Sequence, residues 1–248
     1  LICVPTTAGT GAETESTAML TDTEQSVKRC VWHAKQKPLL AVLDPELTLG
    51  LPADLTAWTG CDALVHAIEA FSVPDWNPLC DGLALEAIRL ISGSLDRAVT
   101  HGEDLEARGA MLVGSCLAGI SFLKGLGLVH AMSHMVGAVC DTHHGLTNAV
   151  LLPPVLLFNK SALLQRSPQI SQAMGLLSQD FEGMYAGVVE LLDTLEIPRG
   201  LSDLQVPDKK LDIIAEKAFT DAARSTNPVS SSVSEIRELL EVSFYKAR

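Results

Sequence analysis

The chain has 248 residues, with 30 acidic and 18 basic side chains and a formal net charge of −12. No cluster of lysine and arginine interrupts this acidic balance, so the sequence predicts no nucleic-acid partner. Hydrophobic residues make up 47% and charged residues 19%, which is typical of a well-packed soluble enzyme rather than a disordered chain. No apolar run approaches the roughly 18–20 residues of a membrane span, and no signal peptide is predicted, so we expect no membrane partner.

The cysteines show no CxxC pairing, and most lie in apolar sequence surroundings. We interpret them as reduced, buried thiols of a cytoplasmic protein, because disulfides persist mainly in oxidising compartments. They are Cys3, Cys30, Cys61, Cys80, Cys116 and Cys140.

The first fifty residues have the character of strands and turns. Residues 1–5 (LICVP) and 38–43 (PLLAVL) are apolar runs that predict buried strands, and residues 28–34 (KRCVWHA) alternate weakly. A strand needs neighbours, and residues 1–50 supply few of them. Because the chain also begins with leucine rather than methionine, we expect it to be the later part of a longer protein.

From residue 51 onward the apolar pattern is helical. Asp54 and Thr56 are candidate caps for the first helix, and Ser232 with Glu235 forms a capping box before the last one. Helices are predicted over about 53–72, 79–100, 103–122, 127–138, 146–158, 181–194, 208–222 and 233–246.

The segment GCDALVHAIEAF places a carboxylate and an imidazole in an otherwise apolar helix. Asp62 and His66 are four residues apart, so they share one helical face. Burying such groups is costly unless they have partners. Taken alone, the pair is explained by a capping aspartate and a hydrogen-bonded core histidine.

Four of the seven histidines lie in HAMSHMVGAVCDTHHG, residues 130–145. His130 and His134 again share a helical face, while His143 and His144 follow a turn. Three imidazoles and one carboxylate form a natural site for a divalent metal, either Fe(II) or Zn(II). The spacing does not decide which of the four histidines are ligands.

A Gly/Thr-rich turn, PTTAGTGAE, follows the first predicted strand over residues 5–13. Its backbone N–H groups and hydroxyls could bind a phosphate or a ribose. The turn matches neither GxGxxG nor GxxxxGK, so a plain turn explains it equally well.

These segments together resemble the iron-containing (group III) alcohol dehydrogenases. The matching motifs are PTTAGTGAE, VLDPELTLGLP, GCDALVHAIEAF, GLGLVHAMSH, HHGLTNAVLLP and TNPVSSSVSEI, in order and at compatible spacing. The resemblance covers essentially the whole chain. It implies a mainly α fold: residues 51–248 form the C-terminal helical metal-binding domain of the dehydroquinate synthase-like, iron-containing alcohol dehydrogenase fold. Residues 1–50 hold the last strands of a Rossmann-like nucleotide-binding domain.

The resemblance also implies roles for individual residues. The implied metal ligands are Asp62, His66, His130 and His144. His134 matches a histidine that lines the substrate and nicotinamide pocket, which makes it the candidate for proton relay or substrate positioning. The residues implied at the cofactor are Thr6, Thr7, Gly9, Thr10 and Lys28.

The implied activity is reversible oxidation of an alcohol, with NAD or NADP as the hydride acceptor and Fe(II) or Zn(II) polarising the substrate oxygen. The implied partners are a small-molecule alcohol or aldehyde and further copies of the chain in a homodimer or larger homo-oligomer. One alternative is a dehydroquinate synthase-like metal- and NAD-dependent lyase, which would need a lysine and arginine set for a polyanion. The other is a non-catalytic helical domain that the metal stabilises.

The sequence departs from the family pattern in three ways. Many members of the family have PHG where this chain has HHG, so we expect His143 to lie outside the ligand set or to be exposed. The stretch FLKGLG is one residue shorter than usual, which bears on the substrate pocket. The glycine-rich loop that binds pyrophosphate in relatives precedes the matched region, so we expect this chain alone to hold a metal but to turn over alcohol poorly.

Overall fold

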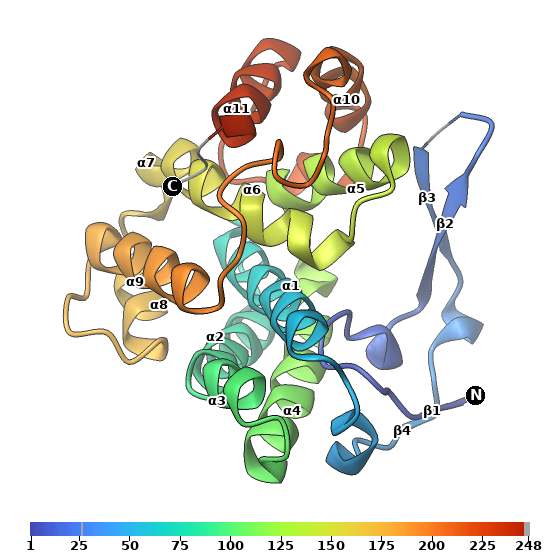
Figure 1. The fold of residues 1–248 in the computed structure, drawn as a ribbon, viewed down its shortest axis with the longest axis vertical. Helices are drawn as coiled ribbons and strands as arrows, with labels where there is room; N and C mark the ends of the chain where they lie inside the picture. Colours follow the sequence, from blue (N-terminus) through green and yellow to red (C-terminus); the bar gives the residue numbers. More distant parts are fainter. Residues whose placement is uncertain (26, 246–248) are drawn as a thin grey trace.

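The structure is a computed structural model that describes residues 1–25 and 27–245. Most of the described chain is helical, and α1 lies at the centre, between a group formed by α2, α3 and α4 and a second group formed by α5, α6, α10 and α11 (Figure 1). The mainly α prediction is confirmed. The helices are α1 (Ala53–Ser72), α2 (Pro78–Ser92), α3 (Leu95–Thr100), α4 (Leu105–Ser121), α5 (Leu128–Cys140), α6 (His144–Phe158), α7 (Lys160–Leu163), α8 (Ser167–Ala173), α9 (Phe181–Thr194), α10 (Leu211–Phe219) and α11 (Val233–Tyr245).

The described strands lie before α1, at one side of the helical body (Figure 1). Strand β1 (Ile2–Cys3) pairs in parallel with β4 (Leu40–Ala41), and β2 (Thr17–Asp22) pairs antiparallel with β3 (Val27–Trp32). The expected strands at both ends of residues 1–50 are therefore present, but they are only two residues long. The prediction that they are buried is wrong, because Ile2 and Leu40 are exposed and Cys3 and Ala41 are half-buried.

Strand β2 was missed by the sequence analysis. Its central side chains from Ala18 to Thr21 are all exposed, so they show no alternation of buried and exposed positions. The strand exists because it pairs with β3 over its whole length, and such pairing leaves no periodic mark in the sequence of one strand.

The predicted helices agree with the structure to different degrees. The boundaries of α1 and α9 are the predicted ones, whereas the expected helix over 79–100 is broken into α2 and α3 at Gly93 and Ser94. Both α7 and α8 were missed. The last expected helix ends at residue 246, which lies outside the described residues.

The two capping predictions had opposite outcomes. The box before α11 is confirmed: the Ser232 N–H donates to Glu235 Oε2 at 2.8 Å, and the Glu235 N–H donates to Ser232 Oγ at 3.2 Å. At α1 the prediction is wrong, because the helix begins after Pro52 without a side-chain cap. Asp54 accepts only from the N–H next to it, and the Thr56 hydroxyl donates to the Pro52 carbonyl.

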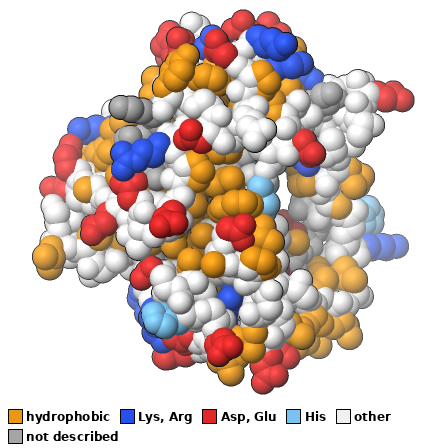
Figure 2. Space-filling view, in the orientation of Figure 1, with side chains coloured by type: hydrophobic (Ala, Val, Ile, Leu, Met, Phe, Trp, Pro, Cys, Tyr) orange, Lys and Arg blue, Asp and Glu red, His pale blue; other side chains and the backbone are white. Residues whose placement is uncertain are grey.

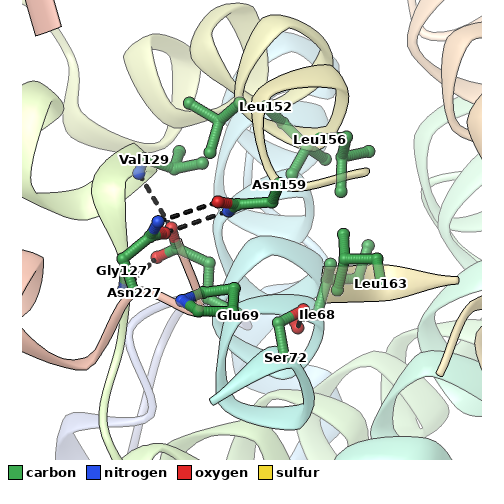
Figure 3. Close-up of a pocket in the computed structure, with 12 residues that line it drawn as sticks. Ile68, Glu69, Ser72, Gly127, Val129, Leu152, Leu156, Asn159, Leu163 and Asn227 are labelled. Carbon is green, nitrogen blue, oxygen red and sulfur yellow. Dashed lines mark hydrogen bonds between the residues drawn. The ribbon is translucent and has the colours of Figure 1, made fainter. Parts of the chain in front are cut away.

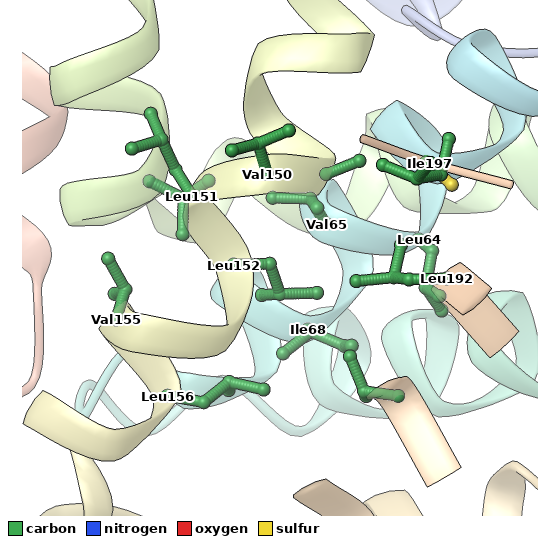
Figure 4. Close-up of a cluster of buried hydrophobic side chains, with 14 of the residues drawn as sticks. Leu64, Val65, Ile68, Val150, Leu151, Leu152, Val155, Leu156, Leu192 and Ile197 are labelled. Atoms are coloured by element: carbon green, nitrogen blue, oxygen red, sulfur yellow. The ribbon is translucent and has the colours of Figure 1, made fainter. Parts of the chain in front are cut away.

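The core draws buried apolar side chains from most of the helices, and those of α1 and α6 pack against each other (Figure 4). Leu64 and Ile68 of α1 and Leu152 of α6 are each about 1% exposed. Burial of one such side chain stabilises a fold by about 1.5–3 kcal/mol. The two helices therefore form a rigid base for the polar residues that they carry at one end of their contact.

The segment Leu105–Lys124, which contains α4, is apolar and long enough to cross a membrane by length and composition. In this fold half of it is buried inside the protein, where α4 packs against α1 and α2. It also carries Arg108, which is 3% exposed and donates to the Thr56 hydroxyl and to the Gly102 carbonyl. These contacts are those of a core helix.

No disulfide joins any of the six cysteines, all of which lie in the described part of the chain. The expectation that they are buried holds only in part. Cys61 and Cys80 are buried and Cys30 is exposed. The other three are half-buried: Cys3, Cys116 and Cys140.

Candidate metal centre and cofactor loop

The start of α6 lies directly on the backbone of α1 because residue 145 is glycine. A Cβ atom at Gly145 would lie 2.3 Å from the carbonyl oxygen of Trp58 and 3.0 Å from Cβ of Asp62. No other residue fits without separating the helices. This close approach brings His144 and Asn148 of α6 to Asp62 of α1.

Four side chains from α1, α5 and α6 converge at this point. Asp62 Oδ1 lies 3.8 Å from His66 Nε2, 3.7 Å from His130 Nε2 and 3.5 Å from His144 Nε2. All four potential ligand atoms lie within 4.8 Å of one another. Asp62, His66 and His130 are at most 5% exposed, whereas the His144 side chain is 36% exposed.

This geometry fits a divalent ion. Bonds of about 2.0–2.2 Å place the ligand atoms of a tetrahedral site roughly 3.3–3.6 Å apart, close to the separations around Asp62 Oδ1. Three imidazole nitrogens and one carboxylate oxygen suit iron or zinc. The structure thus brings together the four residues that the resemblance implied.

Neighbouring side chains orient two of the imidazoles and the carboxylate. His130 Nδ1 lies 2.6 Å from Glu69 Oε2, and His144 Nδ1 lies 3.2 Å from Ser133 Oγ. The amide nitrogen of Asn148 donates to Asp62 Oδ1 at 2.7 Å and lies 3.2 and 3.1 Å from Nε2 of His130 and His144. An amide N–H can only donate, so these contacts favour imidazoles whose Nε2 atoms carry lone pairs.

The pKa values of two groups follow from burial and from the charges that they share. Burial is the largest influence on Asp62 and opposes its ionisation, but His66, His144 and His130 together outweigh it and hold the pKa of Asp62 below its usual range. Burial also acts most strongly on His130 and lowers its pKa, yet the nearby carboxylates of Asp62 and Glu69 outweigh burial and raise the pKa of His130 to about 9.

The other two imidazoles behave differently. Burial lowers the pKa of His66 to about 4 and that of His144 to about 3, with Asp62 acting in the opposite direction in both cases. Both are therefore neutral near pH 7. A neutral imidazole offers a lone pair to a metal without first losing a proton.

His134 lies beside the cluster but is not one of its four members. Its Nδ1 lies 3.0 Å from Asp221 Oδ2, and its ring stacks on that of His144 with centroids 5.4 Å apart. The side chain is 13% exposed. His134 is thus held by a carboxylate at the edge of the candidate metal centre.

The Gly/Thr-rich loop lies against the helices that surround the cluster. A Cβ at Gly9 would lie 2.7 Å from Cβ of Thr59 in α1, and a Cβ at Gly11 would lie 2.7 Å from Cα of Gly119 in α4. Thr59 lies three residues before Asp62 on α1, so the loop packs on the helix that carries two residues of the cluster. The loop and the candidate metal centre therefore adjoin.

The expected cofactor residues are not all in one place. Thr6 and Thr10 are exposed in the loop, Thr7 is half-buried, and Thr10 Oγ1 accepts from the N–H of Ala12. Lys28 lies on β3, where its ammonium donates to Thr21 Oγ1 at 2.8 Å rather than to the loop. Figure 2 shows a hollow between the helical body and the strand side of the molecule, with a histidine at its rim.

Sequence reasoning missed three residues of this region. Glu69 and Asn148 could have been found from the sequence. They lie three and four residues after the implied ligands His66 and His144, so each shares a helical face with a ligand. Asp221 could not, since 87 residues separate it from His134.

Two family models match the chain. Residues 56–244 match the model described as "Fe-containing alcohol dehydrogenase family, C-terminal", and residues 1–45 match "Iron-containing alcohol dehydrogenase". The chain belongs to the iron-containing alcohol dehydrogenase family. The match of the larger segment covers all four residues of the candidate metal centre.

Individual relatives agree with this membership. The chain is 41% identical to the "Probable alcohol dehydrogenase EutG" of Escherichia coli (strain K12), over 95% of this chain and 60% of the relative. It is 38% identical to the "NAD-dependent methanol dehydrogenase" of Bacillus methanolicus, over 97% of this chain and 65% of the relative. The crystal structure of a 1,3-propanediol oxidoreductase superposes with a TM-score of 0.94 at 39% identity, covering 98% of this chain and 65% of that one. The chain thus spans less than two thirds of the length of these relatives.

The two neighbouring histidines provide a first test of the candidate centre. His143 contacts Trp58, and its Nδ1 accepts from the N–H of Leu146 at 3.3 Å, so it caps α6 instead of facing Asp62. We expect His144→Ala to lose most of its bound metal, whereas His143→Ala keeps it and loses about 0.5–2 kcal/mol of unfolding free energy with the cap. Elemental analysis and thermal unfolding of both variants measure this. Equal metal loss in both would contradict the choice of His144.

Proposed function

We propose that the protein is a metal-dependent, NAD(P)-linked alcohol dehydrogenase that interconverts a small alcohol and its aldehyde or ketone. The observation that carries the proposal is the convergence of one carboxylate and three imidazoles within 4.8 Å. The names of the relatives support the same chemistry, since they are alcohol, methanol and 1,3-propanediol dehydrogenases. Because the chain spans only part of their length, the activity is proposed for the protein as a whole.

In this proposal Asp62, His66, His130 and His144 hold the metal. An iron or zinc ion bound there supplies Lewis acidity toward the oxygen of the alcohol or the carbonyl. Asp62 contributes the negative charge that compensates the ion, and the imidazoles contribute neutral lone pairs. Burial of the first three residues keeps water away from most of the site.

We assign the movement of the substrate proton to His134. Asp221 accepts the hydrogen bond from Nδ1, which leaves Nε2 as the atom that takes up and releases a proton. The stacking on His144 places this ring next to a proposed ligand without making it one. Its partly exposed position gives the proton a route to solvent.

The proposed cofactor is NAD or NADP, whose nicotinamide would accept the hydride from the alcohol. We assign its binding to the loop residues next to α1 and to the lysine of β3. These residues are Thr6, Thr7, Gly9, Thr10 and Lys28. The support is that Gly9 packs against Thr59, three residues before Asp62 on α1, so a nicotinamide seated on the loop would lie near the proposed metal.

We further propose that residues 1–50 belong to the nucleotide-binding part of the protein and residues 51–248 to its metal-binding part. Every described strand precedes residue 51, which supports this division. A cytoplasmic location, a homodimer or larger homo-oligomer, and a small-molecule alcohol or aldehyde substrate complete the proposal.

The charges around the cluster favour a dehydrogenase over a lyase that binds a polyanion. Among the described residues, the charged groups with the largest influence on the pKa values of Asp62, His66, His130 and His144 are carboxylates and imidazoles. A polyanionic substrate would need cations there. Metal analysis together with NADH formation from 1,3-propanediol or methanol, measured on the full-length protein and on this chain alone, tests the proposal. Bound metal without NADH formation in the full-length protein would instead indicate a metal-stabilised domain without activity.

The His134→Ala variant tests the division of roles within the site. In the full-length protein we expect turnover to fall by about 10²- to 10⁴-fold, the usual contribution of a general acid–base group, while the metal content stays at the wild-type value. Assays of NADH formation and elemental analysis of the same preparation measure both quantities. Loss of metal together with turnover would place His134 among the ligands and contradict the assignment.

A further inference from the structure

The N-terminus of α5, the helix that carries His130, is bound by side chains from two remote segments. Gly127 precedes α5 and offers no side-chain cap. Instead Glu69 Oε1 accepts from the N–H of Val129 at 2.8 Å, and Glu69 Oε2 accepts from the N–H of Gly127 at 3.1 Å. Asn227 Oδ1 accepts from the N–H of Leu128 at 3.1 Å. Figure 3 shows Glu69 and Asn227 meeting at Gly127.

Both oxygens of Glu69 are thereby committed as acceptors. A backbone N–H can only donate, so the carboxylate accepts from two such groups and from His130, whose Nδ1 lies 2.6 Å from Oε2. The imidazole must therefore carry its proton on Nδ1. Its other nitrogen, Nε2, is directed toward the cluster, 3.7 Å from Asp62 Oδ1.

The packing leaves this carboxylate no second position. Glu69 is 6% exposed and His130 is 1% exposed. A Cβ at Gly127 would lie 2.7 Å from Glu69 Oε1 and 2.8 Å from Asn227 Oδ1, so the two polar groups converge on a glycine. Asn227 is itself held by Asn159 through two hydrogen bonds of 3.0 and 2.8 Å between their amides.

We propose that Glu69 is a positioning residue that sets the tautomer and the orientation of His130 and thereby the affinity of the cluster for its metal. The inference rests on the proposed metal-binding role of the four residues in the cluster. A carboxylate that accepts from the second nitrogen of a ligand histidine typically changes metal affinity by about 10- to 100-fold when it is removed. Most residues that hydrogen-bond a metal ligand contact that ligand alone. Glu69 does more, because the same carboxylate also binds the N–H groups at the start of α5, the helix that carries His130.

The test compares metal affinity in Glu69→Gln and in a control, Glu86→Gln, whose exposed carboxylate on α2 pairs only with Arg89 in the described contacts. In Glu69→Gln the amide N–H₂ must face either a backbone N–H or His130 Nδ1, and the second choice moves the imidazole proton to Nε2. We expect the affinity for Co(II), titrated by its visible absorption, to fall by roughly 10- to 100-fold in Glu69→Gln and to stay unchanged in the control. Wild-type affinity in Glu69→Gln would overturn the proposal.

Two further measurements keep the test decisive if Glu69→Gln folds poorly. The ¹⁵N chemical shifts of the His130 ring in metal-free wild-type protein should show a proton on Nδ1, and a proton on Nε2 alone would overturn the proposal. Asn227→Ala removes the other contact with the start of α5 but leaves Glu69 on His130, so we expect reduced thermal stability with an unchanged tautomer. A wild-type chain that binds no Co(II) would refute the metal site itself, whereas wild-type binding without an effect of Glu69→Gln would refute only this inference.

Discussion

Asp62→Asn is expected to remove metal binding almost completely. Asp62 is the only carboxylate among the four converging residues, and its Oδ1 lies within 3.8 Å of Nε2 of each histidine. The amide has nearly the same shape and can still accept the hydrogen bond from Asn148. It has no charge, however, so a divalent ion would sit among neutral groups in a buried site, where uncompensated charge is costly.

Removing a residue that only hydrogen-bonds a metal ligand lowers metal affinity by roughly 10- to 100-fold. We expect the affinity of Asp62→Asn for Co(II) or Zn(II) to fall by more than this. A binding site that is filled at 100 times its Kd stabilises the folded state by about 2.7 kcal/mol, so added metal should raise the unfolding temperature of the wild type but not of the variant. Asp212→Asn is the matched control, because that side chain is 79% exposed on α10. Full metal occupancy in Asp62→Asn would show that the carboxylate is not a ligand.

The parts of this site that could be predicted from the sequence are those that depend on helical geometry alone. Asp62 and His66 share a face of α1 because four residues make about one turn, and the same holds for His130 and His134 of α5. The sequence also predicted the boundaries of α1, since its apolar pattern is long and regular. A local pattern of this kind does not depend on where the other helices lie.

The choice among the four histidines could not be predicted in this way. His130 faces Asp62 because Glu69 and the start of α5 fix its ring, whereas His134 faces Asp221, which is 87 residues away. Residues so far apart in sequence meet only through the packing of α1, α5 and the segment after α10. The resemblance to a known family therefore supplied the proposed ligand set that spacing left open.

The strands were harder to predict for a related physical reason. Strands β1 and β4 pair over only two residues, and β2 is exposed along most of its length, so neither burial nor alternation marks them clearly. The break between α2 and α3 at Gly93 was missed because the apolar spacing continues across it. For the strands, pairing with a partner outside the local window decided the structure.

Gly145→Ala is expected to have a large effect on both stability and metal binding. In a helix, this exchange usually stabilises a protein by about 0.5–1 kcal/mol. Here the new Cβ would lie 2.3 Å from the carbonyl oxygen of Trp58 and 3.0 Å from its carbonyl carbon. These are backbone atoms of α1, the central helix, so the start of α6 must move instead.

That movement separates His144 and Asn148 from Asp62, which they contact at 3.5 and 2.7 Å. Overpacking of this kind costs about 1–3 kcal/mol of unfolding free energy, and each kcal/mol lowers the unfolding temperature of a chain of this size by about 2–4 °C. We expect this loss to be accompanied by a clear decrease in Co(II) affinity. The control is Gly82→Ala in α2, where a Cβ would meet no atom within 4 Å, so that variant should be slightly more stable and bind metal normally. Thermal unfolding of the two variants should show changes in stability of opposite sign, and Co(II) titration should show weaker binding in Gly145→Ala alone. A Gly145→Ala variant as stable as Gly82→Ala would contradict the close contact of α6 with α1 on which the candidate metal centre depends.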